Sequence, residues 1–466
     1  MHLEQIYLAC LSQASYLIVD EKTKTAVVVD PRRDVAVYLE KAERLGARIR
    51  HVLLTHLHAD FLAGHLELRE RAGATIHLGA KGQAEYDFQP MQDGGVLEFG
   101  DVRLEFLETP GHTPESVSIV VYDLARSRTK PQAVLTGDTL FIGDVGRPDL
   151  LVGVGMKAED MAGMLYESLH GKLLKLPDET LLYPGHGAGS ACGKNLSAET
   201  SSTLGDQRRT NYALQPMAKA AFVRILTGAQ PDAPAYFAHD AVLNRADRPT
   251  LEEILVQALK PLPLDEVLRL ANGGAQLLDT RGADAFAAEH LAGAVNIGLS
   301  GRFASWVGTV FDPKSTIVLI SDPGKEEESA VRLGRIGYDR IAGCLQGGMN
   351  AAADRPELLV RSVRVEREGL AKALSGSKPP QVVDVRLDGE WEAGHIEGAL
   401  HLPLASLTQR IAELPADRDL VIVCKSGYRS SIAASLIERA GFPRVTDLRG
   451  GMDAWLQGAQ PVTAGR

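Results

Sequence analysis

The sequence predicts an α/β protein of several domains, in which two sheets faced by helices precede two smaller α/β modules. Three observations predict this. The chain has 466 residues, enough for about three domains of ordinary size. In its first half, short apolar runs alternate with segments whose apolar residues recur three and four positions apart, as in strands and helices. In its second half, the chain repeats itself at an interval of 105 residues, as from Asp279 to Asp384.

Strands and helices are predicted in alternation through the first half. Two strands flank the turn-like Asp20-Glu21-Lys22-Thr23, and glycines at 94–95 and 100 mark two further turns. The predicted strands are residues 16–19, 26–30, 51–54, 74–78, 95–99 and 102–107. The predicted helices are residues 35–45, 161–169 and 217–226.

Histidines and aspartates recur just after apolar runs. Thr55-His56-Leu57-His58-Ala59-Asp60 follows the apolar run at 51–54. His112, Asp138 and His186 each follow a later run. An isolated pair of histidines is usually only polar, with its hydrogen bonds satisfied. Repeated placement at strand ends instead predicts one converging metal site.

This order of motifs resembles the metallo-β-lactamase fold over about residues 1–240, which implies an αββα sandwich. In that superfamily the first motif usually reads His-x-His-x-Asp-His and holds two metals. Phe61 occupies the last of these positions here, and a phenyl ring cannot bind a metal, so the second metal site loses a ligand. Two imidazoles and one carboxylate suit a single iron(II) with open positions. This departure resembles the persulfide dioxygenase branch.

The resemblance to that branch implies a role for each motif residue. It implies one Fe²⁺ per chain, bound by His56, His112 and Asp138. Three further motif residues would orient ligands or hold water through hydrogen bonds: His58, Asp60 and His186. Arg147 matches an arginine that faces the substrate in that branch.

Two further features near the motifs have open interpretations. Cys192 lies in a loop of small residues beyond His186. It either packs as a buried thiol or borders the substrate pocket, where it could exchange with a persulfide. Arg208 and Arg209 are either solvated on a surface helix or supply positive charge to an anionic thiol cofactor.

The totals restrict the class of protein. The net charge of −10, with no lysine- or arginine-rich run, argues against general nucleic-acid binding. The four cysteines are widely separated, which fits a reducing compartment rather than a disulfide framework. No signal peptide and no apolar stretch of about 18 residues is evident. We therefore expect a soluble cytoplasmic protein without membrane partners.

The second half consists of a connector and two copies of one module. Residues 228–263 are proline-rich and predict a connector with one helix, at 251–259. Asp279, Arg281 and His290 recur 105 positions later, and both copies end in Gly-Gly-Met. Both copies resemble rhodanese domains over nearly all of residues 263–463. The expected boundaries are a metal domain at 1–240, a linker at 241–262, and modules at 263–358 and 359–466.

The two copies differ where sulfur chemistry would take place. In the second, a strand at 420–423 leads into Cys424-Lys425-Ser426-Gly427-Tyr428-Arg429 and a predicted helix at 431–440. Backbone N–H groups, the helix dipole and nearby cations favour a thiolate there and suit an anion. The loop resembles that of active rhodaneses, which implies that Cys424 and Arg429 are catalytic and that four residues bind substrate: Lys425, Ser426, Gly427 and Tyr428.

The corresponding loop of the first copy, Asp322-Pro323-Gly324-Lys325-Glu326, has no cysteine, and Cys344 lies outside it. We expect this copy to be unable to carry sulfur and to act as a spacer or docking module.

These resemblances imply a two-step sulfur chemistry. The iron site would oxidise a low-molecular-weight thiol persulfide, such as that of glutathione or coenzyme A, with O₂ to sulfite and thiol. Cys424 would interconvert sulfite and thiosulfate. The alternatives are a thioester hydrolase of the glyoxalase II kind, which Phe61 disfavours, and a sulfur carrier or sensor with a structural metal. The sequence leaves open the thiol, the direction of transfer and whether the chain forms a homo-oligomer.

Overall fold

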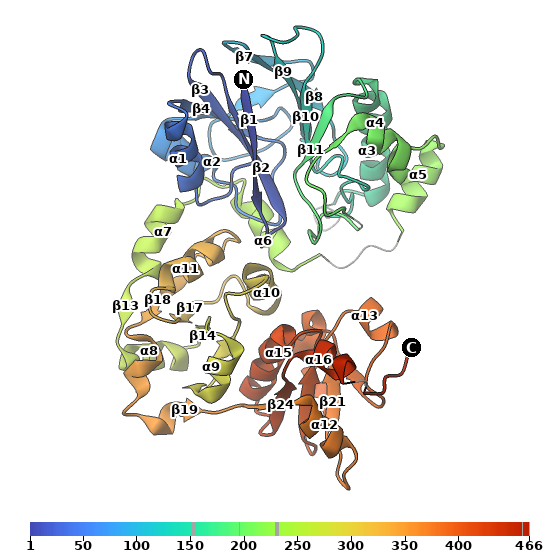
Figure 1. Ribbon diagram of the computed structural model, residues 1–466. Coiled ribbons are helices and arrows are strands. Elements are labelled where there is room, and N and C mark those ends of the chain that lie inside the picture. The colour runs from blue at the N-terminus through green and yellow to red at the C-terminus, as the bar shows by residue number, and fades with distance from the viewer. Residues whose placement is uncertain (151–154, 195, 229–232, 459, 466) are drawn as a thin grey trace. The chain divides into compact units, whose positions relative to one another are not determined.

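The computed structural model describes all residues except 151–154, 195, 229–232, 459 and 466 (Figure 1). The chain divides into two compact units. The first consists of residues 1–253 and 334–337, and the second of residues 254–333 and 338–466. No helix among the described residues is both long enough and apolar enough to span a membrane.

The first unit contains two six-stranded sheets. The strands of one lie in chain order: β1 (His2–Leu8), β2 (Gln13–Val19), β3 (Thr25–Val29), β4 (Arg48–Leu54), β5 (Thr75–Gly79) and β6 (Gln89–Met91). The other has the order β12 (Ser202–Thr203), β11 (Leu181–Pro184), β10 (Ala133–Gly137), β9 (Val117–Asp123), β8 (Val102–Glu108) and β7 (Val96–Phe99).

One apolar core joins these two sheets. Tyr16 and Leu53 of the first sheet pack in the same buried cluster as Leu104 and Ile119 of the second. Helices α1 (Ala36–Arg44) and α2 (His65–Ala72) cover the outer face of the first sheet, where Tyr38 and Leu66 are fully buried. Helices α3 (Ala158–Gly171) and α5 (Lys219–Leu226) cover the second. The result is an αββα sandwich, which confirms the predicted fold class.

The strands carry the metal motifs to one edge of the sandwich. In the first sheet β3, β4, β5 and β6 run parallel to one another. In the second, β10 and β11 are parallel, and β9 is antiparallel to both β8 and β10. The motif residues follow the carboxyl ends of β4, β8, β10 and β11, which is where open α/β sheets bind their ligands.

The second unit contains two five-stranded sheets, in which every strand pairing is parallel. The first copy has the order β13 (Pro261–Leu262), β18 (Ile341–Leu345), β17 (Ile317–Ile320), β14 (Gln276–Asp279) and β16 (Val295–Asn296). The second copy has the equivalent order β20 (Val363–Val365), β24 (Val445–Leu448), β23 (Leu420–Val423), β21 (Gln381–Asp384) and β22 (Leu400–His401).

Hydrogen bonds join the two copies around helix α15 (Tyr428–Arg439). The Ser431 hydroxyl donates to Asn296 Oδ1 at 2.7 Å, and the Asn296 backbone N–H donates to Ser435 Oγ at 3.0 Å. The Tyr428 hydroxyl donates to the Gly298 carbonyl at 2.7 Å. The first copy therefore contacts the helix that follows the Cys424 loop of the second.

The structure differs from the prediction in three places. Helix α15 begins at Tyr428, three residues before the predicted start, because Gly427 has φ +91° and directs the chain into the helix. The connector contains α6 (Tyr236–Leu243) as well as α7 (Leu251–Ala258), since Tyr236 and Phe237 are buried there. Strand β9 was not predicted, because it is buried on both faces and lacks an alternating pattern.

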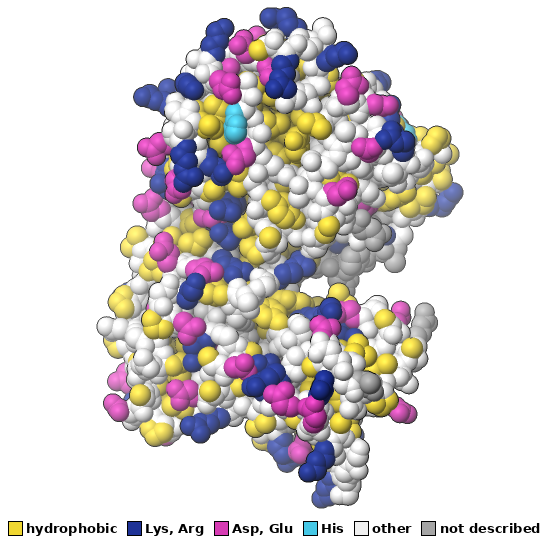
Figure 2. Space-filling model, viewed as in Figure 1, with side chains coloured by type: hydrophobic (Ala, Val, Ile, Leu, Met, Phe, Trp, Pro, Cys, Tyr) yellow, Lys and Arg dark blue, Asp and Glu magenta, His cyan; other side chains and the backbone are white. Residues whose placement is uncertain are grey.

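Charged side chains of both signs are mixed on one face of the molecule. On the face shown in Figure 2, lysines and arginines are interspersed with aspartates and glutamates over both units.

Asn296→Ala should destabilise the second unit. The Asn296 side chain is buried, donates to the Asp279 and Arg281 carbonyls, and accepts from Ser431. Losing these bonds inside the protein should lower the free energy of unfolding by about 1–3 kcal/mol. Urea denaturation followed by circular dichroism measures this change. Asn272→Ala, at the exposed end of α8 (Leu264–Asn272), is the control. Equal midpoints for the two variants would contradict the expectation.

Candidate metal centre and sulfur-transfer loop

Three predicted ligands converge at the carboxyl edge of the sandwich. His56, His112 and Asp138 are all buried, and each offers a ligand atom within 4.8 Å of those of the other two. His56 follows β4, His112 follows β8 and Asp138 follows β10. The two sheets thus bring together residues that lie up to 82 positions apart in the chain.

Hydrogen bonds fix the tautomers of both histidines. Thr55 Oγ1 donates its hydrogen to Asp30 Oδ2 at 2.8 Å, so it accepts from His56 Nδ1 at 3.0 Å. His112 Nδ1 lies 2.9 Å from the Arg147 carbonyl, which can only accept. Both rings therefore carry their proton on Nδ1 and present the lone pair of Nε2, the arrangement typical of metal-binding histidines.

The Asp138 carboxylate has one occupied and one open oxygen. Oδ1 lies 2.8 Å from His186 Nδ1. Oδ2 has no hydrogen-bond partner among the described residues and lies 3.5 Å from His112 Nε2 and 3.9 Å from His56 Nε2. A buried carboxylate oxygen that faces two nitrogen lone pairs is costly unless a cation lies between them. These three residues therefore fit a metal ion.

The pKa shifts of His56 and Asp138 agree with metal binding by these residues. Burial lowers the pKa of His56 well below its usual value, which favours the neutral, metal-binding imidazole. Burial acts to raise the pKa of Asp138, but His186 and the two ligand histidines outweigh it and keep this pKa below its usual range. Asp138 is therefore ionised, as a metal ligand must be.

The three residues expected to orient the ligands are His58, Asp60 and His186, and they differ in their contacts. His186 lies between two carboxylates, with Nδ1 toward Asp138 and Nε2 2.8 Å from Asp60 Oδ2, and these charges raise its pKa despite burial. His186 thus orients Asp138, and Asp60 in turn supports His186. His58 Nε2 lies 3.0 Å from Asp30 Oδ1, so His58 is tied to the carboxylate that also holds Thr55.

A second buried group adjoins the first. Asp60, His186 and Cys192 offer ligand atoms within 4.8 Å of one another. Phe61 is fully buried beside them, with ring centroids 4.3 Å from His58 and 6.5 Å from His186. Burial raises the pKa of the Cys192 thiol, and the nearby Asp60 and Asp138 charges add to this. Cys192 therefore lies at the metal centre in its neutral form.

Arg147 links the ligand loop to the loop of Cys192. Its guanidinium pairs with Asp149 through two hydrogen bonds of 2.8 and 2.6 Å and also contacts the Ala191 carbonyl. Its backbone N–H donates to the Cys192 carbonyl, and its own carbonyl holds His112. Arg147 is buried, and its carbonyl contacts the predicted ligand His112. Its role toward a substrate stays a prediction.

Arg208 and Arg209 lie in local contacts on α4 (Leu204–Thr210). Arg208 donates to the Leu174 and Leu176 carbonyls, and Arg209 pairs with Asp206. Both arginines therefore have structural partners.

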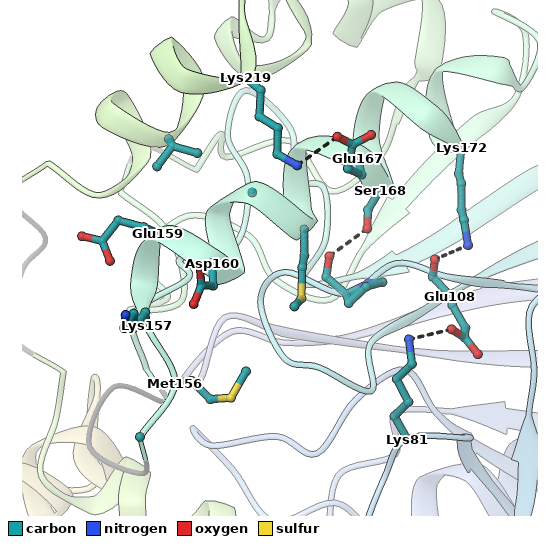
Figure 3. Close-up of a pocket in the computed structure, with 15 residues that line it drawn as sticks. Lys81, Glu108, Met156, Lys157, Glu159, Asp160, Glu167, Ser168, Lys172 and Lys219 are labelled. Atoms are coloured by element: carbon teal, nitrogen blue, oxygen red, sulfur yellow. Dashed lines mark hydrogen bonds and ion pairs between the residues drawn. The ribbon is translucent and has the colours of Figure 1, made fainter.

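The pocket in Figure 3, with a volume of about 680 Å³, lies elsewhere on α3 and contains none of the predicted site residues. Some of its charged side chains form ion pairs, as in Lys81 with Glu108 and Lys219 with Glu167. It is therefore not the metal site.

The Cys424 loop forms a cradle at the N-terminus of α15. The Gly427 N–H donates to Cys424 Sγ at 3.1 Å, and the thiol lies 3.5 Å from Ser430 Oγ. Lys425 pairs with Asp453 at 2.8 Å, and Arg429 is held by Glu390. A backbone donor and a helix N-terminus around the sulfur stabilise a thiolate or a bound anion.

Sequence reasoning missed several supporting residues. Asp30 binds the side chains of Thr55 and His58. It follows an apolar strand, as the predicted site residues do, so the sequence pattern could have identified it. Glu390 has no motif of its own, and only a comparison of the two copies could have revealed it. Arg364 and Asp447, which pair at 2.9 Å behind Ser430, had no signal in the sequence.

Comparisons with known proteins agree with this description. Residues 8–186 match the model of the metallo-beta-lactamase superfamily, and residues 264–354 and 368–458 each match a rhodanese-like domain. A metallo-beta-lactamase from Staphylococcus aureus subsp. aureus COL, known as a crystal structure, is 32% identical with a TM-score of 0.65. The match covers 74% of this chain and 98% of that one.

Three curated relatives are similar to parts of the chain. Persulfide dioxygenase ETHE1 of Homo sapiens is 31% identical over 46% of this chain and 75% of its own length. The probable hydroxyacylglutathione hydrolase glo2 of Schizosaccharomyces pombe is 31% identical over 37% of this chain and 62% of its own length. A sulfurtransferase of Allochromatium vinosum is 38% identical over 22% of this chain and 94% of its own length.

The chain belongs to the metallo-beta-lactamase superfamily through its first unit and carries two rhodanese-like domains in its second. Within that superfamily, the first unit is related both to persulfide dioxygenases and to hydroxyacylglutathione hydrolases.

Removing a ligand should remove the metal. We expect Asp138→Ala and His112→Ala to lose the ion that the wild type carries, as measured by elemental analysis of the purified protein. His186→Gln should weaken metal binding by about tenfold to a hundredfold, because His186 only orients Asp138. The control is Asp20→Ala, which changes a buried aspartate bound to Thr23. Wild-type metal content in Asp138→Ala would refute the ligand assignment.

Proposed function

We propose that the first unit is a persulfide dioxygenase with one Fe²⁺ per chain, which oxidises a low-molecular-weight thiol persulfide with O₂ to sulfite and thiol. The second rhodanese-like domain then transfers sulfane sulfur through Cys424. One observation carries the proposal: the buried group contains two imidazoles and one carboxylate, and Phe61 stands where a further imidazole would complete a second site. A set of this kind is typical of iron(II) oxygenases.

The chain's own residues would hold the ion and keep its ligands in place. His56 and His112 offer Nε2 because Thr55 and the Arg147 carbonyl hold their Nδ1–H groups. Asp138 offers Oδ2 because His186 holds Oδ1. Iron(II) held by these three residues would supply the redox chemistry for the reaction of O₂ with a persulfide sulfur.

The overall oxidation balances with one water. A persulfide R–S–SH, O₂ and H₂O give R–SH, sulfite and two protons. The outer sulfur is oxidised and O₂ is reduced, so no further reductant is needed. Cys192 lies beside the metal group as a neutral thiol, so it does not add a negative charge next to an anionic persulfide.

The second step uses the Cys424 cradle. The Cys424 thiolate attacks the outer sulfur of thiosulfate or of a persulfide. The S–S bond breaks, and sulfite or a thiolate leaves with the electron pair. The Gly427 N–H, which points at Sγ, stabilises negative charge on the sulfur. An acceptor then takes the outer sulfur and restores the thiolate. Because both sites belong to one chain, sulfite from one site reaches the other at a raised effective concentration.

A thioester hydrolase is the second candidate, and one observation favours it. Asp60, His186 and Cys192 form a second buried group that could hold a further ion, and such hydrolases act with two metals. Against it, Phe61 occupies the position of the missing imidazole.

The two steps can be separated with Cys424→Ser. We expect the iron-loaded wild type and this variant to consume O₂ at equal rates when a persulfide is added in an oxygen electrode. Sulfite should accumulate in the variant, and thiosulfate should form in the wild type. Cys344→Ser is the matched control, because that buried thiol only donates to the Ala258 carbonyl in the first copy.

Two outcomes would contradict this proposal. A protein that takes up no O₂ after loading with iron(II) is not a dioxygenase, and its metal is then structural or hydrolytic. Equal thiosulfate from the wild type and Cys424→Ser would remove Cys424 from the second step.

Phe61→His tests the hydrolase alternative directly. A histidine at this position adds an imidazole to the Asp60–His186 group, and we expect the variant to bind a second metal per chain and to lose O₂ uptake. Metal analysis and a glutathione thioester assay check this result. If the wild type already binds two metals and hydrolyses the thioester, the dioxygenase proposal is wrong.

A further inference from the structure

We propose that Glu390 is a positioning residue of the sulfur-transfer site, which fixes the Arg429 guanidinium beside the Cys424 loop and offsets part of its charge. The inference rests on the proposed role of Cys424. It concerns a residue that belongs to neither the loop nor the sheet.

Glu390 and Arg429 form a two-point ion pair. Arg429 Nη1 donates to Glu390 Oε2 and Nη2 donates to Oε1, both at 2.7 Å. The Leu387 backbone N–H also donates to Glu390 Oε2 at 3.1 Å, which fixes the carboxylate in turn. Both side chains are largely shielded from solvent, at 14% and 28% exposure. Two parallel hydrogen bonds hold a guanidinium in one plane, which a single contact cannot do.

The two copies share a buried aspartate–arginine ion pair with the same geometry. The Arg386 Nε–H lies 2.9 Å from both carboxylate oxygens of Asp384, and Nη2 lies 2.6 Å from Oδ2. In the first copy Arg281 binds Asp279 through the same atoms at 3.0, 3.1 and 2.6 Å. These pairs are therefore a requirement of the fold.

A ring stack next to Glu390 is also retained. Trp391 stacks on His395 with centroids 3.5 Å apart, and Phe286 stacks on His290 at 3.7 Å. In each copy the histidine Nδ1 lies within hydrogen-bond distance of the carbonyl of its stacking partner, at 3.0 and 2.9 Å. The backbone around position 390 thus keeps its shape in the copy that lacks the pair.

The first copy has lost three groups together. Strand pairing aligns Asp384 with Val423 and Asp279 with Ile320, so Ser321 occupies the position of Cys424. Gly324 and Gly427 match three residues later, with φ +81° and +91°. Five residues after Ser321, Glu326 stands at the position of Arg429. The repeat interval of 105 residues puts Ala285 at the position of Glu390.

The repeat therefore separates the requirements of the fold from those of the chemistry. A copy with alanine in place of Glu390 keeps the sheet, the Asp–Arg pair and the ring stack, so the module does not need Glu390 to fold. Glu390 is present only where Cys424 and Arg429 are present. Its carboxylate sets the plane of Arg429 and reduces the pull of that cation on a bound anion, so that sulfite can leave.

Glu390→Gln should separate binding from turnover. The amide keeps the size of the side chain but removes its charge, so Arg429 attracts anions more strongly and is less fixed. In thiosulfate sulfurtransferase assays we expect kcat to fall by roughly tenfold to a hundredfold. KM for thiosulfate should fall in the same variant, because sulfite and thiosulfate are held more tightly. Glu390→Asp should recover part of kcat.

The control is Glu413→Gln. Glu413 forms an exposed pair of the same two-point kind with Arg410 at 2.8 and 2.7 Å, in the same domain. Its loss should leave both constants unchanged. The melting temperatures of the Glu390 variants should equal that of the wild type, as the first copy implies.

A second readout needs no turnover and keeps this inference separate from the proposed function. Iodoacetate and iodoacetamide both alkylate Cys424, and the ratio of their rates reports the charge that the loop presents. We expect Glu390→Gln to raise this ratio by about threefold or more, since an opposing charge is removed nearby. Arg429→Gln should lower it. If the ratio is unchanged in Glu390→Gln, the inference is wrong even if the enzyme transfers sulfur. If the ratio shifts but the protein has no sulfurtransferase activity, only the proposed function is refuted.

Discussion

The metal centre depends on how the Asp138 carboxylate divides its two oxygens. One is occupied by His186, and the other faces the imidazoles of His56 and His112 without a protein partner. The backbone at Gly185 must lie close to the Asp138 carboxylate for this arrangement. A Cβ atom at position 185 would lie 2.6 Å from Asp138 Oδ1. The glycine in Pro184-Gly185-His186 is therefore required by packing, as the histidine is by its contact with Asp138. The sheets supply the rest, since parallel strands deliver each ligand at the same edge.

The tandem repeat offers a comparison within one molecule. Features shared by the two copies, such as Asp279–Arg281 and Asp384–Arg386, serve the fold, because they persist in the copy whose loop has no cysteine. Features confined to the second copy, such as Cys424 and Arg429, are the ones to which the proposed sulfur transfer assigns a role. The first copy has not become idle, because its residues Asn296 and Gly298 bind helix α15 next to the active loop. The first copy thus contacts the helix that follows the Cys424 loop, although its own loop has no cysteine.

The sequence predicted the layers of the fold and named three residues that converge into a group able to hold a metal, but not the groups that orient these residues. Strand ends were visible as apolar runs followed by His or Asp. Strand β9 was not visible, because burial on both faces removes the alternation that marks a strand. The partners of the ligands were mostly hidden as well. The Arg147 carbonyl that holds His112 is a backbone atom, and no residue type reports it. Glu390 lies 39 positions from Arg429, and only the folded module brings their side chains together.

In each unit, a side chain that cannot bind a metal or carry sulfur stands at a position where the related motif has a reactive group. Phe61 fills the position of an imidazole and packs fully buried between His58 and His186, so the second group loses a nitrogen but no volume. Ser321 stands where the first copy would carry a thiol, and its hydroxyl lies 2.8 Å from Thr280 Oγ1 and 3.2 Å from Ser329 Oγ. Ser321 thus has hydrogen-bond partners of its own, whereas the buried atoms His58 Nδ1 and Asp60 Oδ1 near Phe61 have none among the described residues. The two side chains therefore change which atoms each site offers, because a phenyl ring has no ligand atom and a hydroxyl is a weaker nucleophile than a thiolate.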